Sequence, residues 1–379
     1  MGRGKGRRLA LIVAMLAAAA CMCPVARGWP RALTPTPWPT RVIRTATPTD
    51  VAEPLAYDIT YWALLIPGIY HLYGQYLDDL VVVDLTNHGP APMRVHIAAQ
   101  VEHYTDWAAS TVYLDPHGGS ATVALHPVLQ PEAIETLTSL KQANLHIRVR
   151  LLSPDERTLD DFTDRITLYA RRDFPWNLYE MLADMDEHTN NMLLAAWVTP
   201  NDPAVEEWIR RAADYHPSGD MPSGYDADVY DRLAALWDAL DEEYAVTYVS
   251  TSFNVGDLVY DGLYFQRIRF PVEVLHQQSA NCIETTLLWA SAAEALRLHP
   301  YLVLVPGHAY VAIDADPDGD SAYFIETTLI GSGDFDDALA YGGEEWREDR
   351  EHLAAGDADY DMIDIWEARE AGILPMPWH

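Results

Sequence analysis

Three residues in the second half of the chain have the side-chain types needed for nucleophilic catalysis at a carbonyl. Cys282 is the only cysteine outside the first 25 residues, so we expect its thiol to be unpaired. His308 is a candidate base for the thiol proton, and Glu326 is a candidate carboxylate to orient the imidazole. This combination predicts acyl transfer through a Cys-His-Glu triad.

The residues around Cys282 predict that it begins a helix. Asn281 is a favoured N-cap, and Glu284 lies three residues on, where a capping box places Glu or Gln. Cys282 then occupies the first helical position, where the helix dipole favours an anion such as a thiolate and where we expect the sulfur to be exposed. The alternative is a buried apolar cysteine, the commonest environment of an unpaired cysteine.

The segment that follows predicts how His308 and Glu326 meet. YLVLVPGHAYVAIDA and SAYFIETTLI have the composition of two strands, and Pro306–Gly307 interrupts the first of them just before His308. A hairpin symmetric about Pro317 pairs His308 directly with Glu326 across the ladder, within side-chain reach. The Asp-rich turn around Pro317 lacks a carboxylate at the last position of a calcium loop, so we predict no metal site there.

These residues carry a resemblance to a known family. PVEVLHQQSANCIETTLLWASAAEALRLHPYLVLVPGHAYVAID and YFIETTLIG resemble the core of the transglutaminase-like superfamily, a branch of the papain-like cysteine fold. The resemblance is strong over residues 265–331 and weaker over 190–264. It implies a triad of Cys282, His308 and Glu326, with Glu326 standing where the family usually has Asp. The family contains transamidating enzymes, peptidases, amidases and catalytically silent members, so the resemblance implies no single reaction.

The implied acyl transfer needs two donors for the oxyanion. The backbone N–H of Cys282 is one candidate, and the side chain of Gln266 or Gln278 is the second. No cofactor and no metal are expected. The rival hypothesis is a silent binding or scaffolding protein that keeps the fold.

The rest of the chain predicts an α+β protein in four parts. Residues 1–28 have the basic start and apolar run of a signal peptide or, with Cys21, of a lipoprotein leader. Residues 29–55 are rich in Pro and Thr and predict an extended linker. Regularly spaced β-rich runs over 56–172 predict an antiparallel, immunoglobulin-like β-sandwich. Helical periodicity followed by strands over 173–379 predicts the transglutaminase-like domain.

Charge restricts the partners. Residues 1–50 contain eight of the 25 basic residues and one of the 57 acidic residues. Residues 51–379 therefore carry a net charge of −39. Such a body repels phosphate backbones, so nucleic acid is excluded as a partner. We expect a secreted or lipid-anchored, extracytoplasmic protein that acts on protein or peptide in the cell envelope or medium and touches the membrane only through its N-terminus.

Overall fold

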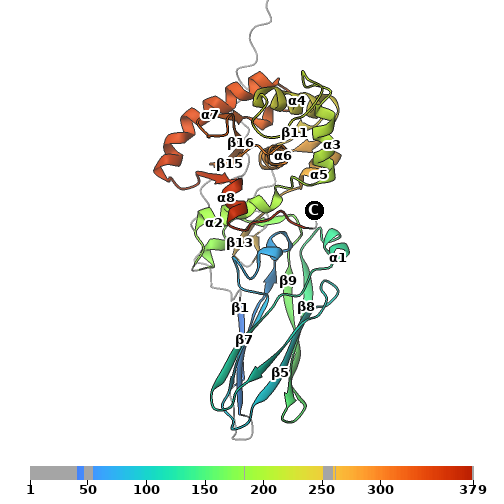
Figure 1. The fold of residues 1–379 in the computed structure, drawn as a ribbon, viewed down its shortest axis with the longest axis vertical. Coiled ribbons are helices and arrows are strands. Elements are labelled where there is room, and N and C mark those ends of the chain that lie inside the picture. Colours follow the sequence, from blue (N-terminus) through green and yellow to red (C-terminus); the bar gives the residue numbers. More distant parts are fainter. Residues whose placement is uncertain (1–40, 47–53, 183, 251–258, 261, 378–379) are drawn as a thin grey trace, which may run out of the picture.

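The computed structural model describes residues 41–46, 54–182, 184–250, 259–260 and 262–377. The predicted leader, residues 1–28, lies outside the described residues. The fold is mixed α+β, with an elongated β region below and a helix-rich region above it (Figure 1). No helix among the described residues is long and apolar enough to cross a membrane.

Two sheets form the β region, and side chains from both enter one core. The first sheet has the order β1-β2-β4-β7, with β1 (Arg41–Ala46), β2 (Leu55–Trp62), β4 (Val81–Asn87) and β7 (Gly119–Leu125). The second has the order β3-β9-β8-β5-β6, with β3 (Leu64–Leu65), β9 (Arg157–Leu168), β8 (Lys141–Ser153), β5 (Met93–Val101) and β6 (Ala108–Leu114). All pairs are antiparallel except β3–β9. Short helical turns interrupt the region at η1 (Pro67–Leu72) and α1 (Pro131–Glu135).

One segment assigned to the linker belongs to this region instead. Residues 41–46 form β1, which pairs antiparallel with β2 along its whole length. The side chain of Arg44 explains part of the attachment, because it forms an ion pair with Asp164 at 3.1 Å and lies over the ring of Phe162. A composition rich in Pro and Thr therefore did not exclude an edge strand.

The helix-rich region begins with short elements and continues with longer helices. Its first part contains β10 (Asp173–Pro175), η2 (Leu178–Glu180), α2 (Glu187–Met192), η3 (Leu193–Trp197), α3 (Pro203–Ala212) and α4 (Val229–Glu242). Four short strands follow, β11 (Thr247–Tyr248), β12 (Val259–Tyr260), β13 (Leu263–Arg267) and β14 (Ser279–Ala280), with α5 (Pro271–Gln277) between the last two. They form a three-stranded sheet of order β10-β13-β12 and a parallel pair of β11 with β14. Asp202 is the N-cap of α3, and its carboxylate accepts from Ala204 N at 2.8 Å.

A four-stranded antiparallel sheet of order β17-β16-β15-β18 organises the remainder. It contains β15 (Pro300–Val305), β16 (His308–Asp314), β17 (Ala322–Ile325) and β18 (Asp361–Asp364). Its two faces bury different side chains. Leu302, Leu304, Ala309 and Val311 share the main core with α6 (Cys282–Ala295), whereas Val303, Val305, Tyr310 and Ala312 form a second cluster with Phe324 and Leu353. The helix α7 (Phe335–Ala355) supplies Leu353 to that second cluster. The short helix η5 (Thr327–Leu329) connects β17 to α7, and α8 (Ile365–Glu370) follows β18.

Two details of the predicted strands were wrong. The segment YLVLVPGHAYVAIDA forms two antiparallel strands rather than one, because the chain reverses at Pro306–Gly307, where Gly307 has φ +78°. Val305 is therefore the direct partner of His308. The next hairpin pairs Val311 with Ile325, two residues away from the predicted register. An even shift leaves every side chain on its predicted face, so His308 and Glu326 stay on the same side of the sheet.

Candidate active site

The start of α6 has the capping predicted from its sequence. Asn281 Oδ1 accepts from Glu284 N at 3.1 Å, and Glu284 Oε2 accepts from Asn281 N at 3.1 Å. Arg269 adds an ion pair to the same carboxylate, with Nε 2.9 Å from Oε1 and Nη2 2.6 Å from Oε2. Only 3% of the Glu284 side chain is exposed, so this pair fixes the helix start from inside the protein.

Cys282 lies at the first position of α6, as predicted, but its surroundings differ from the prediction. The residue is fully buried, so its position at the end of the helix does not expose the sulfur. Cys282 is also disulfide-bonded. The prediction of an unpaired thiol considered only the body of the chain, and the other two cysteines, Cys21 and Cys23, lie outside the described residues.

His308 and Glu326 meet as predicted, although they are not directly opposite in the ladder. Nε2 of His308 lies 2.6 Å from Oε2 of Glu326, and 6% of the Glu326 side chain is exposed. The other oxygen of Glu326 accepts from Thr328 N at 2.8 Å, which makes Glu326 the N-cap of η5. Nδ1 of His308 is buried and has no hydrogen-bond partner among the described residues.

A third side chain, which the sequence reasoning missed, completes this group. Oε1 of Glu345 lies 3.7 Å from Nε2 of His308. The run GGEEWREDRE predicts a solvated acidic face, yet Glu345 belongs to a stripe on α7 that turns toward the sheet. Buried Phe335, Ala338 and Gly342 precede Glu345 at helical spacing, and Asp349 follows it, accepting from Tyr310 Oη at 3.2 Å. That stripe was the available signal.

The group shifts the protonation of its members. Burial acts to lower the pKa of His308, but the hydrogen bonds and negative charges of Glu326 and Glu345 outweigh it and raise that pKa. For Glu326, burial acts upward and the contact with His308 outweighs it, so its pKa is lowered. Burial and the neighbouring charge of Glu326 raise the pKa of Glu345. Glu326 is thus the carboxylate that stays ionised beside a protonated imidazole.

Gly342 allows α7 to reach the sheet. A Cβ atom built there would overlap the carbonyl oxygen of Phe324 and lie 2.9 Å from Glu326 N. Contact this close brings Glu345, one turn further along α7, to His308. The backbone of Glu326 is held to the same helix, since its N–H donates to Ala338 O at 3.0 Å.

Gly342→Ala should therefore destabilise the protein, by about 1–3 kcal/mol, because the added methyl group forces α7 away from β17. The matched variant is Gly343→Ala, whose Cβ would meet nothing within 4 Å. That variant should be neutral or up to about 1 kcal/mol more stable, since Ala favours a helix interior. Thermal unfolding of both variants makes the comparison. Equal stability of the two would show that α7 does not approach the sheet at Gly342.

A short chain of hydroxyl groups connects the start of α6 to the Glu326 turn. Thr285 Oγ1 lies 2.9 Å from the carbonyl oxygen of Cys282 and 2.7 Å from Oγ1 of Thr327, the residue after Glu326. Thr285 and Thr327 are both fully buried. The Cys282 backbone and the Glu326 turn are thus neighbours in the interior.

The two oxyanion candidates lie in different environments. Gln266, on β13, is buried, and its Oε1 accepts from the indole N–H of Trp176 at 3.1 Å, which leaves its amide N–H groups as donors. Gln278 is exposed and ends α5 in a left-handed conformation, with φ +56°. Its side-chain amide donates to Tyr244 O at 2.7 Å.

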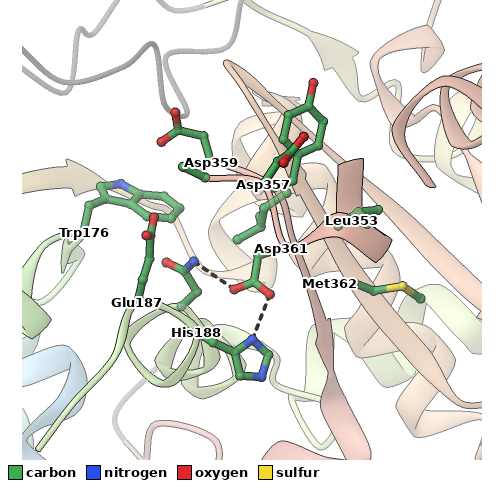
Figure 2. Close-up of a pocket in the computed structure, with 13 residues that line it drawn as sticks. Trp176, Glu187, His188, Leu353, Asp357, Asp359, Asp361 and Met362 are labelled. Atoms are coloured by element: carbon green, nitrogen blue, oxygen red, sulfur yellow. Dashed lines mark hydrogen bonds and ion pairs between the residues drawn. The ribbon is translucent and has the colours of Figure 1, made fainter. Parts of the chain in front are cut away.

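A pocket of about 510 Å³ lies between α2, β18 and the end of α7, and its lining includes none of Cys282, His308, Glu326, Gln266 and Gln278 (Figure 2). Trp176, the partner of Gln266, forms one wall, and Leu304, next to the partner of His308, lines another part. Four carboxylates line it, those of Glu187, Asp357, Asp359 and Asp361. Asp361 accepts from Asn191 at 2.9 Å and contacts Nδ1 of His188 at 2.8 Å. The pocket combines aromatic and acidic walls.

Comparison with known proteins identifies no family. The sequence matches no family model and no curated protein. The solved structures with some likeness include the exo-chitosanase CsxA of Amycolatopsis orientalis and its E541A variant in complex with PNP-β-D-glucosamine. Each match has a TM-score of 0.19 and 9% sequence identity, and covers 55% of this chain and 22% of that chain. A likeness this weak carries no conclusion about fold or function.

Proposed function

We propose that this protein is a thiol-dependent acyl transferase or amide hydrolase of the transglutaminase-like kind, acting on protein or peptide outside the cytoplasm. In this proposal residues 173–379 are the papain-like catalytic domain, and residues 56–172 are an immunoglobulin-like sandwich that presents it. The observation that carries the proposal is the buried hydrogen bond between His308 and Glu326. Thr285 and Thr327 connect the backbone of Cys282 to the residue that follows Glu326.

The proposal requires His308 to act as the base for the thiol, although His308 and Glu345 meet on the face of the sheet that α7 covers and α6 packs on the other face. Glu326 holds Nε2, so the imidazole has one fixed orientation and Nδ1 is the nitrogen left to exchange a proton with Cys282. The Cys282 thiolate attacks the amide carbonyl carbon, the C–N bond breaks, and the leaving amine takes the proton that His308 received. The acyl group remains as a thioester. Water or a second amine then releases it as an acid or a new amide.

Two features support the binding of a peptide carbonyl. The backbone N–H of Cys282 at the start of α6 and the amide of Gln266 are the proposed oxyanion donors. The pocket that borders Trp176 has the mixture of apolar and charged walls of a ligand site, and in this proposal it holds substrate side chains away from the catalytic residues, none of which lines it. Its acidic lining disfavours an acidic segment.

The disulfide sets a condition on this chemistry. Cys282 is disulfide-bonded, so the proposed enzyme reacts only after that bond is reduced. The same bond and the complete burial of Cys282 favour the second candidate, a catalytically silent binding or scaffolding protein. The two candidates differ in whether reduction produces a nucleophile.

The decisive experiment follows products from the full-length protein with and without a thiol-free reductant. A peptide library is incubated with each form, in the presence and absence of a biotin-labelled primary amine, and analysed by mass spectrometry. We expect cleaved or amine-modified peptides only after reduction, because only the thiolate attacks the carbonyl. Cleavage alone identifies hydrolysis, and incorporation of the amine identifies transamidation.

Cys282→Ser is the matched variant, since it keeps the size of the side chain and removes the thiol. The reduced Cys282→Ser protein should lose at least about 10³-fold of the product rate. A reduced wild-type protein that forms no product, or a variant that forms as much as the wild type, would favour the silent candidate. A control on folding comes from circular dichroism of both proteins under the reducing conditions used.

A further inference from the structure

His308, Glu326 and Glu345 converge from three separate elements. His308 begins β16, Glu326 follows β17, and Glu345 lies on α7. One nitrogen or oxygen atom from each lies within 4.8 Å of the others. Nε2 of His308 is 2.6 Å from Glu326 Oε2 and 3.7 Å from Glu345 Oε1. In a tetrahedral zinc site with bonds of about 2.0–2.2 Å, neighbouring ligand atoms are about 3.3 Å apart, so small side-chain movements would suffice.

The two carboxylates of this group need a positive charge beside them, which either a protonated imidazole or a bound metal ion supplies. Two carboxylates face one imidazole, and Glu326 is almost completely buried. Like charges brought together away from water are costly unless a proton or a metal ion lies between them. Oε2 of Glu345 is a buried oxygen without a hydrogen-bond partner among the described residues. Buried polar atoms normally have a hydrogen-bond partner, so this unpartnered oxygen indicates a ligand independently of the convergence of the three side chains.

We propose that His308, Glu326 and Glu345 form a binding site for a divalent transition metal ion of the Zn²⁺ class. Imidazole with carboxylate oxygens suits Zn²⁺ and its neighbours, whereas Ca²⁺ and Mg²⁺ prefer an all-oxygen set. Three protein ligands leave a coordination position for water. The ion reaches the site past Glu345, whose side chain is 36% exposed, while His308 and Glu326 supply the buried ligands.

The metal and the proposed catalysis exclude each other. Binding uses Nε2 of His308 and replaces its hydrogen bond with Glu326, which the proposed function needs to orient the base. A bound metal ion would therefore inhibit the enzyme. The inhibition rests on the proposed function, whereas the binding of the metal ion does not.

The test titrates the full-length protein with Zn²⁺ by calorimetry and with Co²⁺ by visible absorption, without substrate. Glu345→Gln removes one ligand and should weaken metal binding at this site by about 100-fold or more. Replacing a residue that only supports a metal ligand already costs up to about 100-fold in affinity, and Glu345 is itself a ligand. Glu344→Gln is the matched control, since it removes the same charge from an exposed neighbour on α7, and should bind like the wild type.

Cys282→Ser separates this proposal from the proposed function. It should keep the affinity of the wild type, because Cys282 is not one of the three ligands, and Co²⁺ bound to imidazole and carboxylate lacks the strong near-ultraviolet absorption of a thiolate complex. Equal affinity and stoichiometry in the wild type, Glu344→Gln and Glu345→Gln would overturn the metal site, whatever the outcome of the peptide assay. If peptide products are found, Zn²⁺ should suppress them with a midpoint equal to its dissociation constant.

Discussion

Replacing His308 with Gln should lower kcat/KM of the reduced protein by about 10³-fold or more, because a Gln side chain cannot accept the proton of the thiol or return it to the leaving amine. Gln retains a hydrogen-bonding group near Glu326, so the variant removes proton transfer with the smallest change in packing. The rate is measured on the best peptide found with the library, by single-turnover formation of the first product.

The control for this variant is His352→Gln. His352 lies in the last turn of α7, but it is half exposed, and its ion pair within the described part of the chain is with Asp357 at 2.8 Å. We expect unchanged activity from it. Glu326→Gln gives an independent measurement that leaves His308 in place. An amide N–H pointing at Nε2 would force the proton onto Nδ1, the nitrogen that must accept one, and should cost about 10²–10⁴-fold.

If His308→Gln and His352→Gln have equal activity while both remain folded, His308 is not the base. If Glu326→Gln alone retains full activity, Glu326 does not orient the imidazole. In either case the proposed triad is wrong.

The local structure at Cys282 could be predicted because it depends on neighbouring residues. Asn281 and Glu284 form a capping box from their own backbone geometry, so their spacing alone predicted the helix start. The pairing of His308 with Glu326 could be predicted only to the correct face, since alternation along a strand is a local property. The exact register depended on the turn, whose centre lies one residue later than the symmetric estimate, so that each residue of β16 pairs two residues further along.

What could not be predicted depends on contacts between distant segments. Glu345 lies 37 residues beyond His308; the stripe on α7 indicates only that Glu345 faces the protein, and its contact with His308 follows from the close approach of α7 at Gly342. The burial of Cys282 likewise depends on packing around the end of α6. Residues 41–46 have the composition of a linker, and only the free edge of β2 makes them a strand.

The ion pair that fixes the start of α6 gives the largest expected change in stability. Glu284 is buried, closes the capping box and accepts two bonds from the guanidinium of Arg269. Removing one partner of a buried pair leaves the other charge without compensation, which costs about 3–5 kcal/mol. Arg269→Met keeps the apolar stem and removes the charge, so we expect it to lower the free energy of unfolding by that amount. The measurement is chemical denaturation followed by near-ultraviolet circular dichroism.

Two further variants identify the cause of this loss. Arg210→Met removes an arginine that is 67% exposed and pairs with Glu207 on the surface, so it should change stability by less than about 1 kcal/mol. The double variant Arg269→Met/Glu284→Gln removes both buried charges and keeps a hydrogen-bonding side chain at the cap. It should be more stable than Arg269→Met alone, because the penalty comes from the unpaired carboxylate rather than from lost packing. If the double variant is as unstable as the single one, the hydrogen bonds of the guanidinium to Gln277 and Ser279, and not its pairing with Glu284, hold Cys282 at the start of α6.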